Sequence, residues 1–147
     1  MARVLAVAVY EVFIVQARLW LGVPGVPRVA LVPGVKQRGI EWLKRYQDKQ
    51  VELLKRAPAK QRPYKQQADN LDAFVFMVLA EAEIVDDEME NFLYRNRTKL
   101  SVYALGMFGL ALDSAESIER RDMVMRNIDQ FLVQDEENQT AWLNLPD

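Results

Sequence analysis

The chain has 147 residues and a composition close to that of an ordinary globular domain, with half of the residues apolar and 27% charged. It contains neither cysteine nor histidine. These two absences exclude disulfides, thiolate nucleophiles, metal sites built on cysteine or histidine, and Ser-His-Asp triads. Carboxylate, lysine and tyrosine chemistry stays open, as does carboxylate-bound Mg²⁺ or Ca²⁺.

The net charge of −2 conceals two halves of opposite charge. Residues 1–67 hold 13 basic and 4 acidic side chains, whereas residues 68–147 hold 6 basic and 17 acidic ones. A basic half can indicate nucleic-acid binding, but no motif that reads bases accompanies it. We therefore expect the basic side chains to form a solvated face or to pair with the acidic half. Neither a nucleic-acid partner nor a small-molecule substrate is predicted.

The chain begins with a long apolar run followed by a proline-rich segment. Residues 4–21 include Glu11 and Arg18, which disfavour a membrane span, and they lack the features of a clear signal peptide. We predict a buried helix or strand there. Val-Pro then occurs three times before residue 34, which is typical of a linker. Residues 1–29 are thus predicted to be an apolar N-terminal segment with a Pro/Gly linker.

Clear helical periodicity follows. Residues 35–57 place apolar side chains along one stripe with charged ones opposite, which predicts an amphipathic helix that ends before Pro58. After a polar loop, Asp69 is a good N-cap for a second helix over residues 70–83. This second helix is apolar nearly all round, so it should be buried on most sides.

Two further helices repeat this alternation. Residues 86–97 begin with acids and end with arginines, which suits the helix dipole, and they form an amphipathic pattern. Residues 100–112 carry no charge. Gly106 and Gly109 in this segment lower helix propensity, so we expect another backbone to approach closely there.

A last helix and an apolar tail complete the pattern. Asp113 and Glu116 have the spacing of an N-cap and its N3 partner, which predicts a helix over residues 114–133. The tail, residues 134–147, is acidic and then apolar, and its apolar residues need a partner surface. We interpret the three tryptophans as core or interface anchors: Trp20, Trp42 and Trp142.

Buried and amphipathic helices therefore alternate, and the pattern repeats. Three pairs of apolar residues lie 29 positions apart: Leu71 and Leu100, Phe74 and Tyr103, Met89 and Ile118. Such a repeat predicts an all-α fold of stacked helical hairpins, either an open solenoid or a closed α/α toroid.

One acidic cluster has the look of a metal motif. The run Asp86-Asp87-Glu88-Met89-Glu90 superficially resembles the Mg²⁺-diphosphate motifs of helical prenyl-chain enzymes. These acids open a predicted helix, however, where the dipole favours them, and no second acidic motif faces them. Residues 135–137 are expected to form a solvated loop. We predict no catalytic, cofactor-binding or metal-binding residues in this chain.

Several segments together resemble bacterial alpha-2-macroglobulin-like proteins. The resemblance runs in order through RGIEWLKRYQ (38–47), ADNLDAFVFMVLAEA (68–82), FLYRNRTKLSVYALGMFGLAL (92–112) and RNIDQFLVQDEENQTAWLNLP (126–146). In that family the similar part is the thioester-type α/α toroid, which complement proteins share and which is built like the terpenoid-cyclase toroid. Residues 30–147 are accordingly predicted to be part of such a toroid. Residues 1–29 do not match the family, which a wrongly placed start codon or a frame disruption would explain.

The resemblance implies a secreted or periplasmic inhibitor that traps a protease after the protease cuts a bait segment. Many members also carry a Cys–Gln thioester, but this chain has no cysteine, so no residue here can be assigned that role. The implied partners are neighbouring domains of a larger parent protein and, through it, target proteases. A free-standing helical interaction module is the alternative, and a toroid enzyme of terpenoid-cyclase type is a third possibility.

The toroid interpretation also has a physical consequence for the chain on its own. We expect residues 1–147 to be helical and yet to self-associate, because three apolar side chains would lack their usual cover: Phe76, Phe108 and Trp142.

Overall fold

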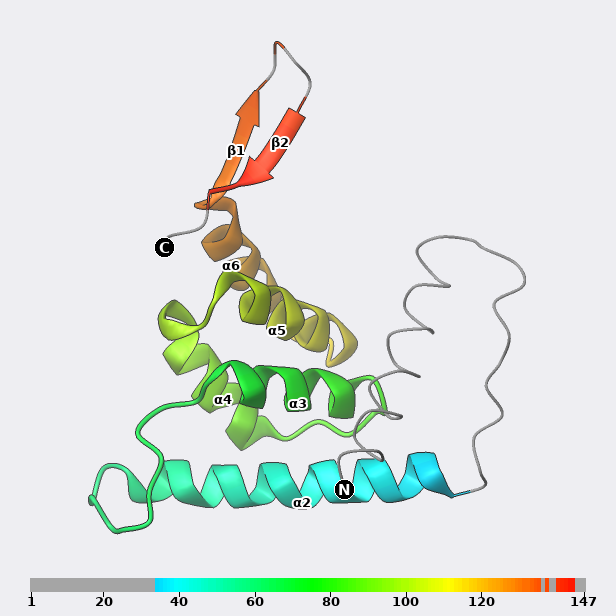
Figure 1. Ribbon diagram of the computed structural model, residues 1–147, viewed down its shortest axis with the longest axis vertical. Coiled ribbons are helices and arrows are strands. Elements are labelled where there is room, and N and C mark those ends of the chain that lie inside the picture. The colour runs from blue at the N-terminus through cyan, green and yellow to red at the C-terminus, as the bar shows by residue number, and fades with distance from the viewer. Residues whose placement is uncertain (1–33, 136, 138–139, 145–147) are drawn as a thin grey trace.

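The computed structural model describes residues 34–135, 137 and 140–144, which form a mainly helical structure ending in a β-hairpin (Figure 1). The elements are α2 (Val35–Arg56), α3 (Asn70–Ala80), α4 (Asp87–Asn96), the 3₁₀ helix η1 (Arg97–Lys99), α5 (Val102–Ser114), α6 (Ile118–Asp129), β1 (Leu132–Asp135) and β2 (Thr140–Leu143). The coarse prediction of a helical fold is confirmed. The predictions for residues 1–29, including Trp20, lie outside the described residues.

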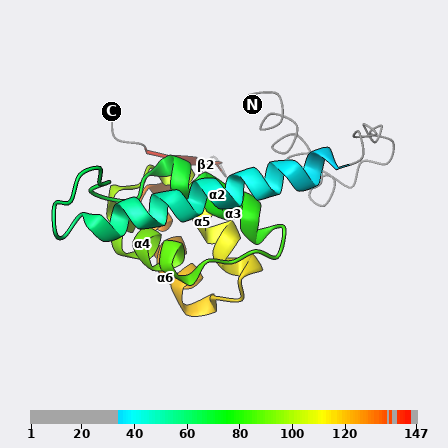
Figure 2. The same cartoon turned by 90° about the horizontal axis from the view of Figure 1, so that it is seen from below.

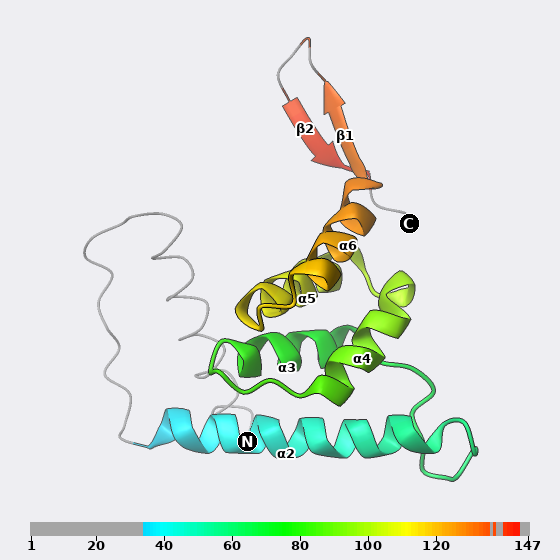
Figure 3. The same cartoon turned by 180° about the vertical axis from the view of Figure 1, so that it is seen from behind.

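Helices α2, α3 and α5 form successive layers (Figures 1 and 3). Helix α3 contacts α2 on one side and α5 on the other, and each of α3 and α5 also packs against the amphipathic helix that follows it. The view from below shows α2 running across the other helices (Figure 2). The described helices thus form two hairpins, α3–α4 and α5–α6, which are stacked on each other and covered at one end by α2.

The two apolar helices supply most of the core, as predicted. Phe76 of α3 and Phe108 of α5 are fully buried, and their ring centroids lie 5.9 Å apart with the planes tilted by 58°. Such a tilted pair adds to the free energy gained by burying the ring surface. The expectation that Phe76 and Phe108 lack cover is therefore wrong, because α3 and α5 bury each other's rings.

The amphipathic helices turn their apolar stripes to this core. On α2 the predicted stripe is confirmed, with Leu43, Val51 and Leu54 buried. Trp42 is partly buried and stacks on Tyr46 with 5.7 Å between ring centroids, which agrees with the expected core anchor. Trp142, by contrast, is half exposed on β2.

The structural repeat is longer than the 29 positions predicted. The N-caps of α3 and α5, Asp69 and Ser101, lie 32 positions apart, as do Phe76 and Phe108. The N-caps of α4 and α6 lie 31 positions apart. The predicted pairs occupy different environments; Met89 is buried whereas Ile118 is exposed. Matching apolar residues alone predicted the wrong repeat length, because apolar residues occur on every turn of α3 and α5.

The predicted helix over residues 114–133 is wrong at both ends. Asp113 lies inside α5 and forms an ion pair with Arg121 at 2.6 Å, so it does not cap α6, whose N-cap is Ser117. Glu116 lies in the turn between the two helices. At the other end the chain leaves the helix after Asp129 and forms the β1–β2 hairpin, in which Leu132 pairs with Leu143 and Val133 with Trp142.

The expected close backbone approach at the two helical glycines is not found. Among the described residues, nothing lies within 4 Å of the position that a Cβ would take at Gly106. At Gly109 the neighbours are side-chain atoms of α6, Val124 Cγ1 at 3.7 Å and Met125 Sδ at 3.8 Å. A Cβ at Gly109 would therefore stand at ordinary contact distance from α6, and one at Gly106 would face open space, so neither position requires glycine for packing.

Three helices end in the same motif. After α2, α3 and α5 one residue takes a left-handed conformation, and the next N–H bonds to the carbonyl five positions back. The left-handed residues are Lys60 (φ 52°), Glu83 (φ 62°) and Glu116 (φ 57°). These are Schellman motifs. Their left-handed position is usually occupied by glycine, because a residue with a Cβ is strained there.

This strain predicts that Glu116→Gly stabilises the protein by about 0.5–1 kcal/mol, since glycine adopts positive φ without steric cost. The matched control Glu119→Gly, within α6, should instead destabilise by about 1 kcal/mol. Urea unfolding followed by far-UV circular dichroism measures both. A Glu116→Gly variant less stable than the parent would contradict the assignment of strain to this residue.

Candidate functional site

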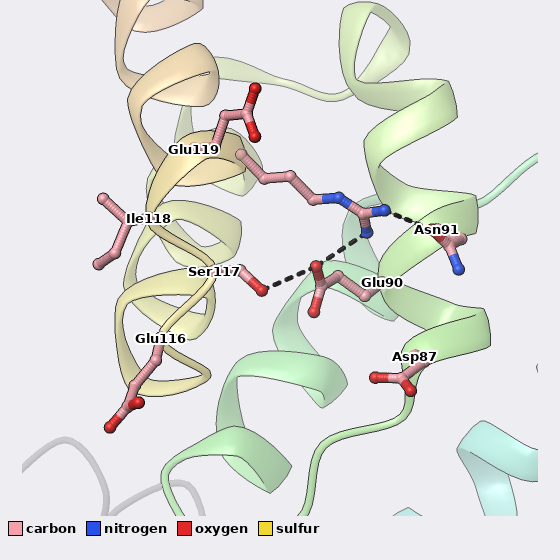
Figure 4. Close-up of a pocket in the computed structure, with 8 residues that line it drawn as sticks. Asp87, Glu90, Asn91, Glu116, Ser117, Ile118 and Glu119 are labelled. Carbon is pink, nitrogen blue, oxygen red and sulfur yellow. Dashed lines mark hydrogen bonds and ion pairs between the residues drawn. The ribbon is translucent and has the colours of Figure 1, made fainter.

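A groove of about 630 Å³ lies between α4 and the start of α6 (Figure 4). It lies at the junction of the two hairpins that the described residues form. Its walls come from α4 on one side and from the α5–α6 turn and the first turn of α6 on the other. The lining residues are Asp87, Glu90, Asn91, Glu116, Ser117, Ile118, Glu119 and Arg120.

A buried carboxylate organises this groove. Glu90 is only 4% exposed, and its Oε1 accepts hydrogen bonds from Arg120 Nη1 at 2.8 Å and from the Ser117 hydroxyl at 3.0 Å. The second guanidinium nitrogen of Arg120 donates to Asn91 Oδ1 at 2.7 Å. Figure 4 shows Glu90 and Asn91 on α4, with Glu90 turned toward Ser117 across the groove. One arginine thus ties the α5–α6 hairpin to α4.

The same arginine also packs on an aromatic ring. The guanidinium carbons of Arg97 and Arg120 lie 4.5 Å and 5.1 Å from the centroid of Tyr94. Both distances are within the range of cation–π attraction. Tyr94 is therefore covered in part by a side chain of the next hairpin. The contacts that line the groove fix how the two hairpins are aligned.

Three acids at the start of α4 make three different contacts. Asp86 caps α4 by accepting from the Met89 N–H at 2.8 Å, Glu88 pairs with Lys55 of α2 at 2.6 Å, and Glu90 pairs with Arg120. The prediction that these acids open a helix is confirmed. Within the part of the chain that the structure describes, no group of three or more acidic, cysteine or histidine side chains is placed to hold a metal ion.

A second polar cluster fixes the loop between α2 and α3. Lys65 Nζ lies 2.7 Å from carboxylate oxygens of both Asp69 and Asp72, and 3.4 Å from Gln50 Oε1 of α2. Asp69 caps α3 as predicted. The Asp72 carboxylate in turn accepts a hydrogen bond from the Asp69 N–H at 2.9 Å, which completes a capping box. The part of Asp72 was not predicted from the sequence, although its spacing three residues after Asp69 is the signal for such a box.

The pKa values of this cluster follow from burial and charge. Burial raises the pKa of Asp72, and the hydrogen bond from Lys65 offsets only part of this effect. For Asp69, the bonds from Lys65 and from backbone N–H groups outweigh burial and lower the pKa. Burial alone would lower the pKa of Lys65, but its two carboxylate partners raise it. The lysine is therefore charged and serves as a fixed structural contact.

The opposite charges of the two halves of the chain meet in these contacts. Lys55 and Lys65 belong to the basic half, whereas their partners Glu88, Asp69 and Asp72 belong to the acidic half. Pairing between the halves is thus found at two places. Asp135, expected in a solvated loop, instead ends β1 and pairs with Thr140 in the register of the hairpin.

Comparisons with protein-family models, with curated proteins and with solved structures gave no match. In the described part of the chain, no helix is both long enough and apolar enough to cross a bilayer. What the site does chemically must therefore be inferred from its geometry, which is that of a junction between packed helices.

Arg120→Ala should destabilise the fold by about 1–3 kcal/mol, because Glu90 would be left buried without its cation. Chemical denaturation measures the change, and combining Arg120→Ala with Glu90→Gln gives a double-mutant cycle. The exposed neighbour Glu119 supplies the control, since Glu119→Ala should change stability by less than about 0.5 kcal/mol. Additive effects of the two groove substitutions would refute the proposed coupling.

The lowered pKa of Asp69 predicts a pH-dependent loss of stability. A carboxyl group of this kind contributes its full stabilisation of the folded state above its ordinary pKa of 3.8. This contribution is lost as the pH falls through the lower pKa that the group has in the folded state. The free-energy gap between the parent protein and Asp69→Asn should therefore be constant from about pH 5 to 7 and should shrink below about pH 4. A gap that persists to about pH 2 would contradict the ion pair.

Proposed function

We propose that this chain is a structural part of an alpha-2-macroglobulin-like protease inhibitor, in which its stacked hairpins form an arc of the α/α toroid. The observation that carries the proposal is the layering of the described helices. The apolar helices α3 and α5 lie inside, and the amphipathic helices α4 and α6 cover them. The order of segments that resemble the family supports the same assignment.

The role proposed for the arc is mechanical. Glu90, Arg120 and Asn91 join the two hairpins, and Lys65 with its two carboxylates joins α2 to α3. An arc tied in this way would move as one body when the parent inhibitor rearranges around a protease. The thioester chemistry of many relatives has no counterpart in this sequence, because it lacks cysteine. A periplasmic or extracellular location is part of the same proposal.

The size of the native gene product tests the proposal. An antibody raised against residues 34–144 should detect, in extracts of the source organism, a polypeptide far larger than 17.0 kDa. The purified parent should block digestion of a large protein substrate by trypsin and spare a small peptide substrate, because a trapped protease keeps a working active site. A 17.0 kDa product alone would overturn the proposal.

A free-standing helical interaction module is the second candidate. It is favoured by the apolar side chains that α5 and α6 leave exposed, Leu110 and Met125. The same immunoblot separates the two functions, since the module predicts the 17.0 kDa product and no association with protease trapping.

A further inference from the structure

Helix α2 carries exposed cations that the described fold does not use. Residues 34–67 hold ten basic and three acidic side chains, a net charge of +7. Lys55 and Lys65 bind acids outside α2, and Lys44 binds Asp48 within it. The other bases of the helix are exposed and form no ion pair with a described residue: Lys36, Arg38, Arg45, Lys49 and Arg56. These cations are therefore available to an anionic partner.

Four of these cations form one row along the outer side of α2. Arg38 and Arg56 are 18 positions apart, which is about five turns, so they lie on the same side of the helix and about 27 Å apart along its axis. Arg45 and Lys49 lie between them, within about 20° of the same direction. The buried Leu54 is on the opposite side. All other described helices and strands lie on that side of α2 (Figures 1 and 3). We call Arg38, Arg45, Lys49 and Arg56 the basic row.

The two edges of the basic row differ in chemistry. Along one edge lie the acids of α2, Glu41, Asp48 and Glu52, the last two of which are paired with lysines. Along the other edge lie Trp42 and Tyr46, which are partly buried and stack with their ring planes 19° apart. We call Trp42 and Tyr46 the aromatic ledge. An anionic chain on the row would be repelled from the acidic edge and displaced toward the ledge.

We propose that the basic row and the aromatic ledge bind single-stranded nucleic acid without sequence preference. The phosphates would pair with the row and the bases would pack against the ledge, a combination that non-specific single-strand binding proteins use. The lack of a base-reading motif agrees with such binding, since contacts to the backbone carry no sequence information. The sequence did not predict a nucleic-acid partner because it does not show which bases of α2 stay unpaired. This inference concerns α2 itself and does not depend on the proposed inhibitor function.

The shape and the edges of the basic row favour a single strand over other polyanions. A double helix and α2 are both stiff convex cylinders, so they would touch over a short length and leave most of the row unused. A flexible single strand can follow the whole row. An anionic membrane is flat and would meet the acidic edge as well as the row. An acidic peptide has no bases to pack against the aromatic ledge.

Fluorescence anisotropy tests the inference, with the full 147-residue protein titrated into a labelled oligothymidylate of about 20 nucleotides. At about 50 mM salt the parent should bind, and the logarithm of the association constant should fall with the logarithm of salt concentration with a slope of about −2.8, as four phosphate contacts require. Arg45→Gln and Lys49→Gln should each weaken binding several-fold and reduce the slope by about 0.7.

Two further variants separate the row from the ledge and from net charge. Arg126→Gln is the matched control, because Arg126 is exposed on α6, remote from α2, and this variant should bind like the parent. Trp42→Leu should weaken binding about fivefold or more and leave the salt slope unchanged, because stacking is lost and no cation is removed. Far-UV circular dichroism verifies that each variant is folded.

Several outcomes would overturn the inference. The first is a parent that does not bind the oligothymidylate at about 50 mM salt. The second is binding by Arg45→Gln and Lys49→Gln that equals that of Arg126→Gln, since net charge and not the row would then be responsible. The third is a duplex of the same length, poly-glutamate or phosphatidylserine vesicles that compete as well as unlabelled oligothymidylate does, because another polyanion would then fit the surface equally.

Discussion

The structure depends on one constraint, which is that α3 and α5 are apolar on nearly every side and must be covered on nearly every side. Their mutual contact through Phe76 and Phe108 satisfies part of this requirement. Helices with one apolar stripe cover further sides, α2 and α4 around α3 and α6 beside α5, whereas Tyr103 and Leu110 of α5 stay exposed. Burial of this apolar surface is the main favourable term in the folding of the described residues. It does not by itself fix how one helix is aligned against the next.

Polar contacts at the edges of the core supply that alignment. Glu90 is buried, so its carboxylate requires partners, and the placement of α6 brings both Ser117 and Arg120 to it. Asp72 plays the same part where α2 meets α3, because its buried carboxylate binds both Lys65 and the first turn of its own helix. These contacts explain why the two buried acids are tolerated. Of these two contacts only the pair of Asp72 with Lys65 joins the oppositely charged halves of the chain, since Glu90 and Arg120 both belong to the acidic half.

The sequence predicted the helices and their burial more accurately than their register. Periodicity and capping located α2, α3 and α4 to within a few residues, since Asp69 and Asp86 are local signals. The start of α6 was misplaced because Asp113 mimics an N-cap, whereas its real partner, Arg121, is recognisable only once the turn is folded. The β-hairpin was missed because its strands are only four residues each, too short to show a clear alternation of apolar and polar side chains. The groove was missed for a different reason, as Glu90 and Arg120 are 30 positions apart and are joined only by the stacking of the hairpins.

The two described hairpins form one packed unit and do not behave as two independent ones. That conclusion depends on α3 and α5 forming one shared core. Hydrogen–deuterium exchange of the intact protein tests this most directly. If α3 and α5 form one core, their amides should exchange slowest and at a common rate, and the amides of the β-hairpin should exchange much faster. Exchange of α5 as fast as that of the β-hairpin, with α3 still protected, would contradict it.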